Sequence, residues 1–238
     1  MKIICGLVML SALGWGQDAP PKIVQKLIQV KYVDANSVHN LLRNFAAGGD
    51  WSMESDERLH VIALRGRPEI VAAFEEAIKK LDVAPADFEL TVYLISSSPQ
   101  AGDQLPDALA STAKQLHGVF GYKGYTLLDS FVLRGRDGQR GTASGTISKD
   151  NKSSTYSFQY ERAAVTGEAP KTVSLHNLNL NVRYHMGTFN KDGQPNYRDT
   201  GLNTDVDARD GQKIVVGKSD VNNGESPLIL VVTAKVVE

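Results

Sequence analysis

Three aspartates and a glycine near the C-terminus have the side chains of a cation site. They are Asp205, Asp207, Asp210 and Gly211. A calcium loop of the EF-hand type needs acids or amides at its first, third and fifth positions and a glycine at the sixth. Counting from Asp205, the fifth position is Arg209 and the glycine comes too late. We therefore expect solvated strand-end and turn residues here and predict no metal site.

The histidines are the next candidate ligands, and they are scattered through the chain. None of the possible pairs has the i, i+4 spacing of a zinc site on a helix. His176 and His185 fall in one expected strand, where simple alternation places them on opposite faces. We expect structural or surface roles for all of them: His39, His60, His117, His176 and His185.

No serine lies in the setting of an activated nucleophile. In the segment from Gly141 to Gly145, Ser144 stands one place too late for a Gly-x-Ser-x-Gly elbow. The sequence also lacks a P-loop and a dinucleotide-binding fingerprint. It therefore predicts no catalytic residue, no cofactor and no enzymatic activity.

Arginines cluster around an Asp-Gly pair, Asp137-Gly138, and they are Arg134, Arg136 and Arg140. We interpret them as a charged strand edge that resists sheet-to-sheet aggregation. The alternative is a contact with an anion or a lipid.

Three aromatic residues, Tyr156, Phe158 and Tyr160, alternate with polar residues. This alternation is typical of one face of a strand, and such a face is more often sheet core than a platform for sugars. We expect core here and keep a sugar platform as the alternative.

The N-terminus has the pattern of an export signal at residues 1–16. Lys2 precedes an apolar run that ends at Leu13, and Gly14 and Gly16 place small residues before a cut at Gln17. The run is shorter than the roughly 20 residues that span a bilayer. An uncleaved anchor is the alternative. We expect a periplasmic protein with no later transmembrane segment.

Two global properties narrow the function further. Cleavage would remove Cys5, which is the only cysteine, so the mature chain would have no disulfide. The formal net charge of −1 over 238 residues gives no sign of a nucleic-acid partner.

Residues 22–84 have the pattern of a βαββα module. A strand is expected at 27–33, and Asp34 is a suitable N-cap for a helix that buries Val38, Leu41, Leu42 and Phe45. Strands at 51–56 and 59–64 follow. Pro68 then opens a second helix with its own apolar stripe. One three-stranded sheet covered on one side by two helices would satisfy every apolar face.

The order and spacing of these motifs resemble the secretin N-domain, a module of bacterial secretins and related envelope proteins. The resemblance covers about 60 residues and implies a non-catalytic, KH-like module that packs side by side into periplasmic rings. It also implies protein partners in a secretion or pilus system and possible homo-oligomers through the module. The matching segments are Tyr32–Asn36, Leu41-Leu42, Ser55-Asp56, Val61–Gly66, Pro68–Ile70 and Leu81–Val83.

Residues 87–238 are predicted to form a mainly antiparallel β domain with one helix, which makes the chain α+β. We expect a strand at 88–95, a helix at 105–120 and a half-wet strand at 178–186. Strands at 125–134 and 141–148 flank Asp137-Gly138, which is a hairpin signal. A strand at 228–237 is apolar on both faces and should be central. Residues 210–217 and this last strand are weakly similar to the end of the secretin core.

These observations together predict an exported, non-enzymatic envelope protein that assembles with a secretin-type secretion or pilus system. One alternative is an exported hydrolase or ligand-binding protein with a site in residues 87–238. Another is a reduced secretin that forms a pore. The second domain is short for that role, so we expect an accessory that is periplasmic or associated with the outer membrane.

Overall fold

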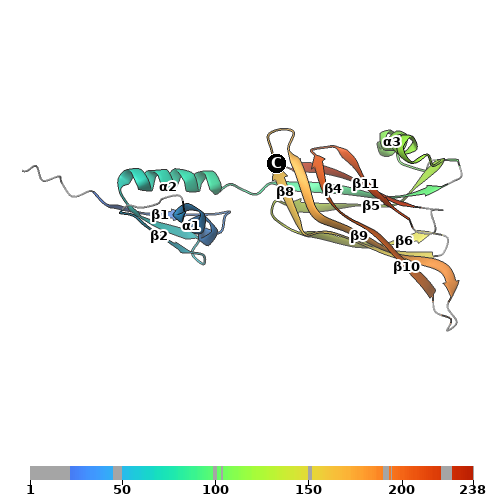
Figure 1. The fold of residues 1–238 in the computed structure, drawn as a ribbon, viewed down its shortest axis with the longest axis horizontal. Coiled ribbons are helices and arrows are strands. Elements are labelled where there is room, and N and C mark those ends of the chain that lie inside the picture. The colour runs from blue at the N-terminus through green and yellow to red at the C-terminus, as the bar shows by residue number, and fades with distance from the viewer. Residues whose placement is uncertain are drawn as a thin grey trace, which may run out of the picture. The chain divides into compact units, whose positions relative to one another are not determined.

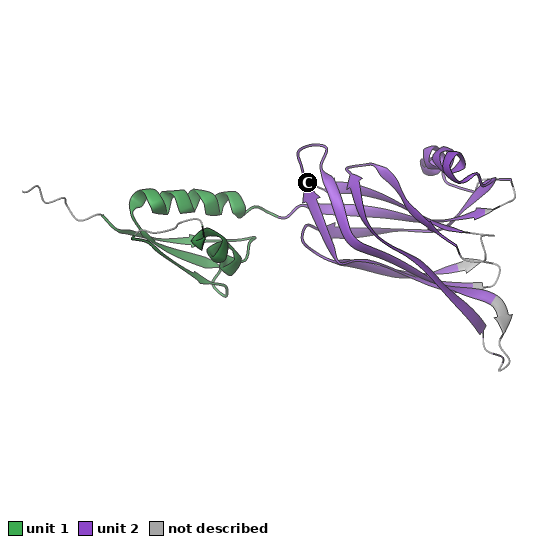
Figure 2. Cartoon of the chain, viewed as in Figure 1, with its two compact units in different colours: residues 1–84 green, residues 85–238 purple. Residues whose placement is uncertain are grey.

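The computed structural model describes residues 22–44, 50–98, 101–102, 104–149, 152–189, 193, 195–220 and 227–237. The predicted signal at 1–16, Cys5 and Phe45 lie outside the described residues. The chain divides into two compact units, residues 1–84 and 85–238 (Figure 2).

The first unit has the βαββα order that the sequence predicts, in an α+β chain. Its sheet is antiparallel with strand order β1-β3-β2, and both helices pack against it around one apolar core (Figure 1). The central strand β3 buries Ile62 and Leu64, and α2 buries Phe74 and Ile78. The elements are β1 (Val24–Gln29), α1 (Ala35–Arg43), β2 (Ser52–Asp56), β3 (Val61–Gly66) and α2 (Pro68–Leu81).

Three predicted details of this unit are wrong. The first strand spans Val24–Gln29 instead of residues 27–33. Leu41 is 46% exposed, because α1 turns the stripe of Ala35, Val38 and Leu42 toward the core. The strand expected at 59–64 begins two residues later, since residues 57–60 form the turn that joins β2 to β3.

The early end of β1 has a physical cause in the carboxylate of Asp82. This side chain accepts hydrogen bonds from the backbone N–H groups of Lys31 (2.9 Å), Tyr32 (2.8 Å) and Val33 (3.3 Å). These N–H groups do not pair with β3 but all donate to Asp82, which lies just after the end of α2. Burial raises the pKa of Asp82, but the three donors outweigh it, so the pKa lies below its ordinary value.

We expect Asp82→Asn to destabilise the first unit by about 1–3 kcal/mol, because the charged acceptor of these bonds is lost. The loss should be full above the ordinary pKa of an aspartate. It should shrink as pH falls through the lowered pKa of the folded state, where the wild-type carboxylate is itself protonated.

Urea unfolding of the chain from Gln17 onward measures this through Trp51, whose ring packs on Phe74 at 5.2 Å between centroids. Glu76→Gln, which removes an exposed ion pair with Lys80, is the matched control and should change stability little. Equal effects of both variants, or a pH-independent effect of Asp82→Asn, would contradict the prediction.

The second unit is a sandwich of two antiparallel sheets. The first sheet has the order β11-β12-β4-β5, and the second has the order β6-β7-β9-β10, with β8 also paired to β9. The elements are β4 (Asp87–Ser98), η1 (Asp107–Leu109), α3 (Ala110–Phe120), β5 (Gly124–Arg136), β6 (Gly141–Lys149), β7 (Lys152–Tyr160), β8 (Arg162–Thr166), β9 (Thr172–Phe189), β10 (Pro195–Arg209), β11 (Lys213–Ser219) and β12 (Leu228–Val237).

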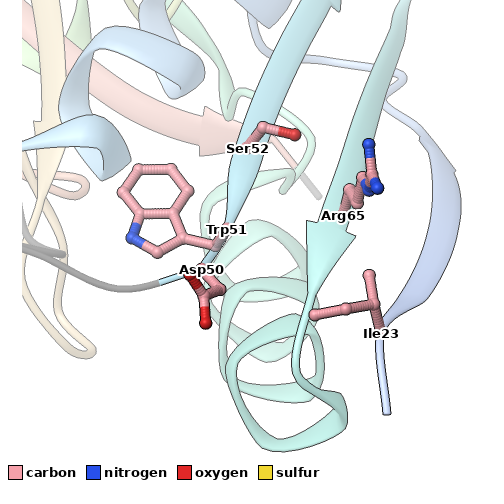
Figure 3. Close-up of a pocket in the computed structure, with 5 residues that line it drawn as sticks. All are labelled: Ile23, Asp50, Trp51, Ser52 and Arg65. Carbon is pink, nitrogen blue, oxygen red and sulfur yellow. The ribbon is translucent and has the colours of Figure 1, made fainter. Parts of the chain in front are cut away.

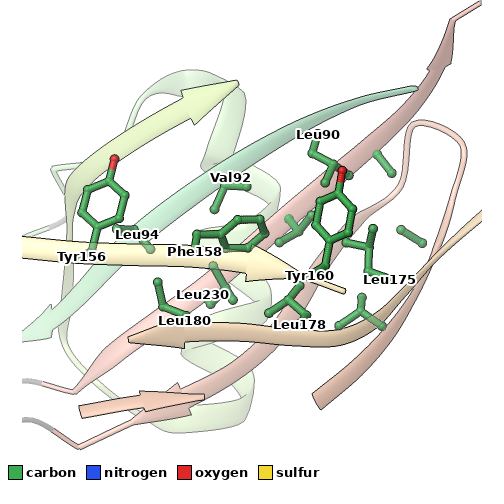
Figure 4. Packing of buried hydrophobic residues seen from close by; sticks show 14 of the residues in the cluster. Leu90, Val92, Leu94, Tyr156, Phe158, Tyr160, Leu175, Leu178, Leu180 and Leu230 are labelled. Atoms are coloured by element: carbon green, nitrogen blue, oxygen red, sulfur yellow. The ribbon is translucent and has the colours of Figure 1, made fainter. Parts of the chain in front are cut away.

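The inner faces of the two sheets form the main core (Figure 4). Strand β4 contributes Phe88, Leu90, Val92 and Leu94, as its alternation predicts. Strand β9 contributes Leu178, Leu180 and Val182, while Asn181 and Arg183 on its other face are exposed. The predicted half-wet character of residues 178–186 is therefore confirmed.

The outer face of the first sheet is buried by α3. Leu109 and Leu116 form a second cluster with Ile229 and Val231 of β12 and with Ile95 of β4. This explains why residues 228–232 are buried on both faces of β12, and it confirms the prediction of a central strand. The predicted helix begins five residues late, at Ala110, after the short turn η1.

The hairpin predicted at Asp137-Gly138 is wrong. β5 pairs with β4 and β6 pairs with β7, so these two residues carry the chain from one sheet to the other. The Asp137 N–H donates to Ala86 O (2.9 Å) and the Gly138 N–H to Ala163 O (2.9 Å). The Asp137 carboxylate accepts from the Val165 N–H at 3.1 Å.

A second corner repeats these bonds where β10 leads into β11. The Asp210 N–H donates to Lys171 O (2.9 Å), and the Gly211 N–H donates to Ala234 O (2.8 Å). The Asp210 carboxylate accepts from the Val236 N–H at 2.9 Å. Each aspartate therefore joins the sheet that the chain leaves to the sheet that it enters.

The two corners belong to a wider internal repetition. Their sequences, 136–139 and 209–212, are both Arg-Asp-Gly-Gln. The strand order of one sheet becomes that of the other when equivalent strands are exchanged. The exchange pairs β4 with β9, β5 with β10, β6 with β11 and β7 with β12. The sandwich is thus built from two equivalent halves, and α3 is an addition to the first half.

Gly138→Ala and Gly211→Ala should each destabilise the second unit by about 1–2 kcal/mol, because a side chain disfavours left-handed backbone. Their φ angles are 79° and 73°. Calorimetric unfolding of the chain from Gln17 onward checks the values.

Gly118→Ala is the control for this pair. Gly118 lies inside α3 with nothing within 4 Å of an added Cβ, so alanine there should stabilise by about 0.5–1 kcal/mol. Unequal losses of stability at the two corners would contradict their equivalence, and a loss of stability for Gly118→Ala would contradict left-handed backbone as the cause of the effect.

Candidate functional site

The acidic residues near the C-terminus serve separate structural tasks. The Asp205 carboxylate accepts from the Asn177 N–H at 2.7 Å, and the Asp210 carboxylate holds the second corner. Asp207 is exposed on β10. In the part of the chain that the structure describes, no three His, Cys, Asp or Glu side chains are grouped to hold a metal ion.

The prediction that His176 and His185 lie on opposite faces of their strand is wrong. Leu175 and Leu178 are both buried, so the alternation of β9 changes phase between them. The cause is a bulge at Asn177, where φ is 50° and the pairing with β10 shifts register. Both histidines therefore share the outward face.

The neighbours of these two histidines differ. His176 Nδ1 lies 3.9 Å from a carboxylate oxygen of Asp205, and the His185 ring lies 5.4 Å from the Tyr197 ring. Elsewhere, His117 Nδ1 bonds to the carbonyl of Tyr122 at 2.8 Å, within the packing of α3.

The aromatic residues of β7 are buried, which confirms the expectation of sheet core. Phe158 is fully buried, and Tyr160 is 1% exposed. Burial, with a hydrogen bond to Asp129, raises the pKa of Tyr156 to about 12. The edge strand β5 carries Arg136, which pairs with Asp87 at 2.7 Å.

The exposed side of the sheet in the first unit has the properties of a binding site. The side of the sheet turned away from the helices is a grid of three rows, set by the strand register. We call it the open face. Its rows are Gln25, Arg65 and Ser52; Leu27, Ala63 and Glu54; and Gln29, Val61 and Asp56.

Two adjoining hollows lie on the edge and centre of the open face. One, of about 350 Å³, is lined by Ile23, Asp50, Trp51, Ser52 and Arg65 (Figure 3). The other, of about 530 Å³, shares Ser52 and Arg65 and extends to Leu27 and Ala63. Ser52 on β2 and Ala63 on β3 are small, and they leave a depression between the longer side chains of Arg65 and Leu27.

The chemistry of this surface suits binding rather than catalysis. Leu27 is 74% exposed, which is unusual for a leucine in the middle of a strand. Arg65 and Glu54 supply opposite charges beside it, and Asp50 lies 4.0 Å from Arg67 at the rim. An apolar centre with a charged border is typical of protein contacts.

The sequence analysis missed the open face because it considered only those alternate residues of β1 that face the core. The signal was Leu27 itself, which is apolar at a position where alternation requires a polar residue.

Among the described residues, no helix has both the length and the apolar character needed to cross a membrane.

Comparisons with known proteins bear on both units. The family model described as the bacterial type II/III secretion system short domain matches residues 25–87. No curated protein sequence matches the chain.

Solved secretin structures resemble the chain over most of its length at low identity. The Vibrio cholerae type IV competence pilus secretin PilQ is 13% identical, with a TM-score of 0.55, over 92% of this chain and 78% of that one. The type II secretin GspD of enteropathogenic Escherichia coli is 11% identical, with a TM-score of 0.56, over 90% and 87%. The Salmonella SPI-1 type III injectisome secretin InvG is 13% identical, with a TM-score of 0.56, over 91% and 89%.

Residues 25–87 therefore match the bacterial type II/III secretion system short domain, and the chain has the fold of the secretins that it resembles.

Proposed function

We propose that this protein is an exported, non-enzymatic component of a bacterial secretion or pilus system, and that the open face is its assembly surface. The observation that carries the proposal is the secretion-system short domain at residues 25–87 with an exposed apolar centre at Leu27. The PilQ, GspD and InvG structures belong to pilus, type II and type III systems, which supports this setting.

The proposed assembly uses the first unit as the contact module. The open face presents Leu27 and Ala63 between the charged side chains of Arg65 and Glu54. Burial of about 25 cal/mol per Å² of apolar surface would favour contact there, and the charges would set its register. The occupant is a second copy of the chain or another component of the same system.

Site-specific photo-crosslinking in the native bacterium tests this proposal. A photoreactive residue at position 27 should give crosslinks to a second copy or to a secretion or pilus component. The matched control is position 59, where Leu59 is also exposed, at 59%, but lies in the turn outside both hollows. Absence of a specific product at position 27, or the same products from both positions, would contradict the proposal.

A second candidate function, a reduced pore-forming secretin, has its own support, because the likeness to secretins extends over about nine tenths of the chain. Against it, the outward face of β9 carries Asn179, Asn181 and Arg183. An arginine at the centre of a bilayer costs about 2–4 kcal/mol on a lipid-facing strand. Purified mature protein should therefore give no discrete conductance steps in liposomes, and reproducible steps would favour the pore.

Export to the periplasm is the remaining element of the proposal. The pattern of Lys2, Leu13, Gly14 and Gly16 predicts that the mature chain begins at Gln17 or within a few residues of it. Intact-mass measurement of protein from the periplasmic fraction tests this. A retained Met1 or a lipid-modified terminus would contradict it.

A further inference from the structure

The open face of the first unit carries two opposite charges that do not pair within their own copy. Arg65 on β3 and Glu54 on β2 are exposed, and they occupy adjoining rows on neighbouring strands. The ion pairs among the described residues involve neither of them. The other acid of this face, Asp56, accepts from the Leu59 N–H at 3.0 Å and so stabilises the turn. Arg65 and Glu54 therefore remain available to a partner molecule, on either side of the apolar centre.

The positions of these residues make the open face complementary to itself. When two identical faces meet about a two-fold axis, residue i contacts residue j of the other copy and j contacts i. An axis that lies in the face midway between Arg65 and Glu54 places each Arg65 against the Glu54 of the other copy. In a sheet, strands are about 4.8 Å apart and alternate residues about 6.8 Å apart. With these spacings and the observed register, the same axis crosses the row of Glu54 midway between Leu27 and Ala63.

The apolar centre of one copy then meets the hollow of the other. Leu27 of each copy lies between Leu27 and Ala63 of its partner, beside the depression that Ala63 and Ser52 leave. The same axis brings Gln25 of one copy near Asp56 of the other, where an amide N–H can donate to a carboxylate. No like charges of the grid face each other in this arrangement, and its exposed leucines leave water together.

We propose that the open face binds the open face of a second copy in a closed two-fold pair, in which Arg65 of each copy contacts Glu54 of the other and the two Leu27 side chains pack at the axis. This inference rests on the assembly surface proposed above and commits it to one occupant. The contact closes at two copies, because each copy uses the same face. Nine positions cover less than the about 800 Å² per partner of a standard interface, so the pair should be transient.

Sedimentation equilibrium of the chain from Gln17 onward, up to about 1 mM, tests the proposal. Arg65→Glu and Glu54→Arg each create two like-charge contacts and should weaken self-association about ten-fold or more. The double variant restores both contacts and should associate as wild type, and a mixture of the two single variants should form mixed pairs. The matched control is Glu76→Arg, because Glu76 is exposed on α2, on the other side of the sheet, and its reversal should change nothing.

A crosslink at the axis tests the geometry. The only cysteine, Cys5, precedes Gln17, so Leu27→Cys gives this chain a single thiol. A short bis-maleimide should join two copies of Leu27→Cys, because position 27 meets itself across the axis. Leu59→Cys, at a site that is 59% exposed in the turn, is the control and should not be joined.

Three results would overturn the proposal: a monomer at about 1 mM, a double variant that does not recover association, or equal crosslinking at positions 27 and 59. The assembly surface itself would fail separately. If the chain is a monomer in solution but position 27 crosslinks to another component in the bacterium, the assembly surface stands and the second copy is excluded as its occupant.

Discussion

Backbone N–H groups at the points where the chain changes direction depend on carboxylates for their hydrogen bonds. In the first unit, Asp82 accepts from three consecutive N–H groups, and Glu57 accepts from Ala35 at the start of α1. In the second unit, Asp137 and Asp210 satisfy the two corners between the sheets. A buried or turning backbone donor that lacks a partner costs about as much as a lost hydrogen bond, so these acids fix where strands end and sheets cross.

The sequence predicted the element order of the first unit and the main strands of the second because their apolar residues recur with a clear period. It failed where the same local signal has two meanings. Asp137-Gly138 favours a positive φ, which both a hairpin and a corner between sheets require, and only the pairing of distant strands decides between them. The repeat at Asp210-Gly211 was the available clue, since two copies of one turn suggest two copies of one connection.

The candidate sites were harder to predict for a related reason. Periodicity identifies residues that face the core, whereas the open face is defined by what none of the described elements covers. Leu27 breaks the alternation of its strand, but a single apolar residue does not predict a binding surface. The phase change at Asn177 likewise moved His176 and His185 to one face, because a single extra residue inverts the alternation of everything that follows it.

The equivalence of the two halves of the sandwich has a consequence for folding in a crowded compartment. The halves pair with each other through equivalent strands, β4 with β12 and β9 with β7, so one half of a chain would find the same pairing partners in a neighbouring chain as in its own. Only residues 167–171 connect β8 to β9, and short connections favour exchange of elements between copies. Because α3 belongs to the first half alone and packs on β12 of the second, it determines which half pairs with which, whether the two halves come from one chain or from two.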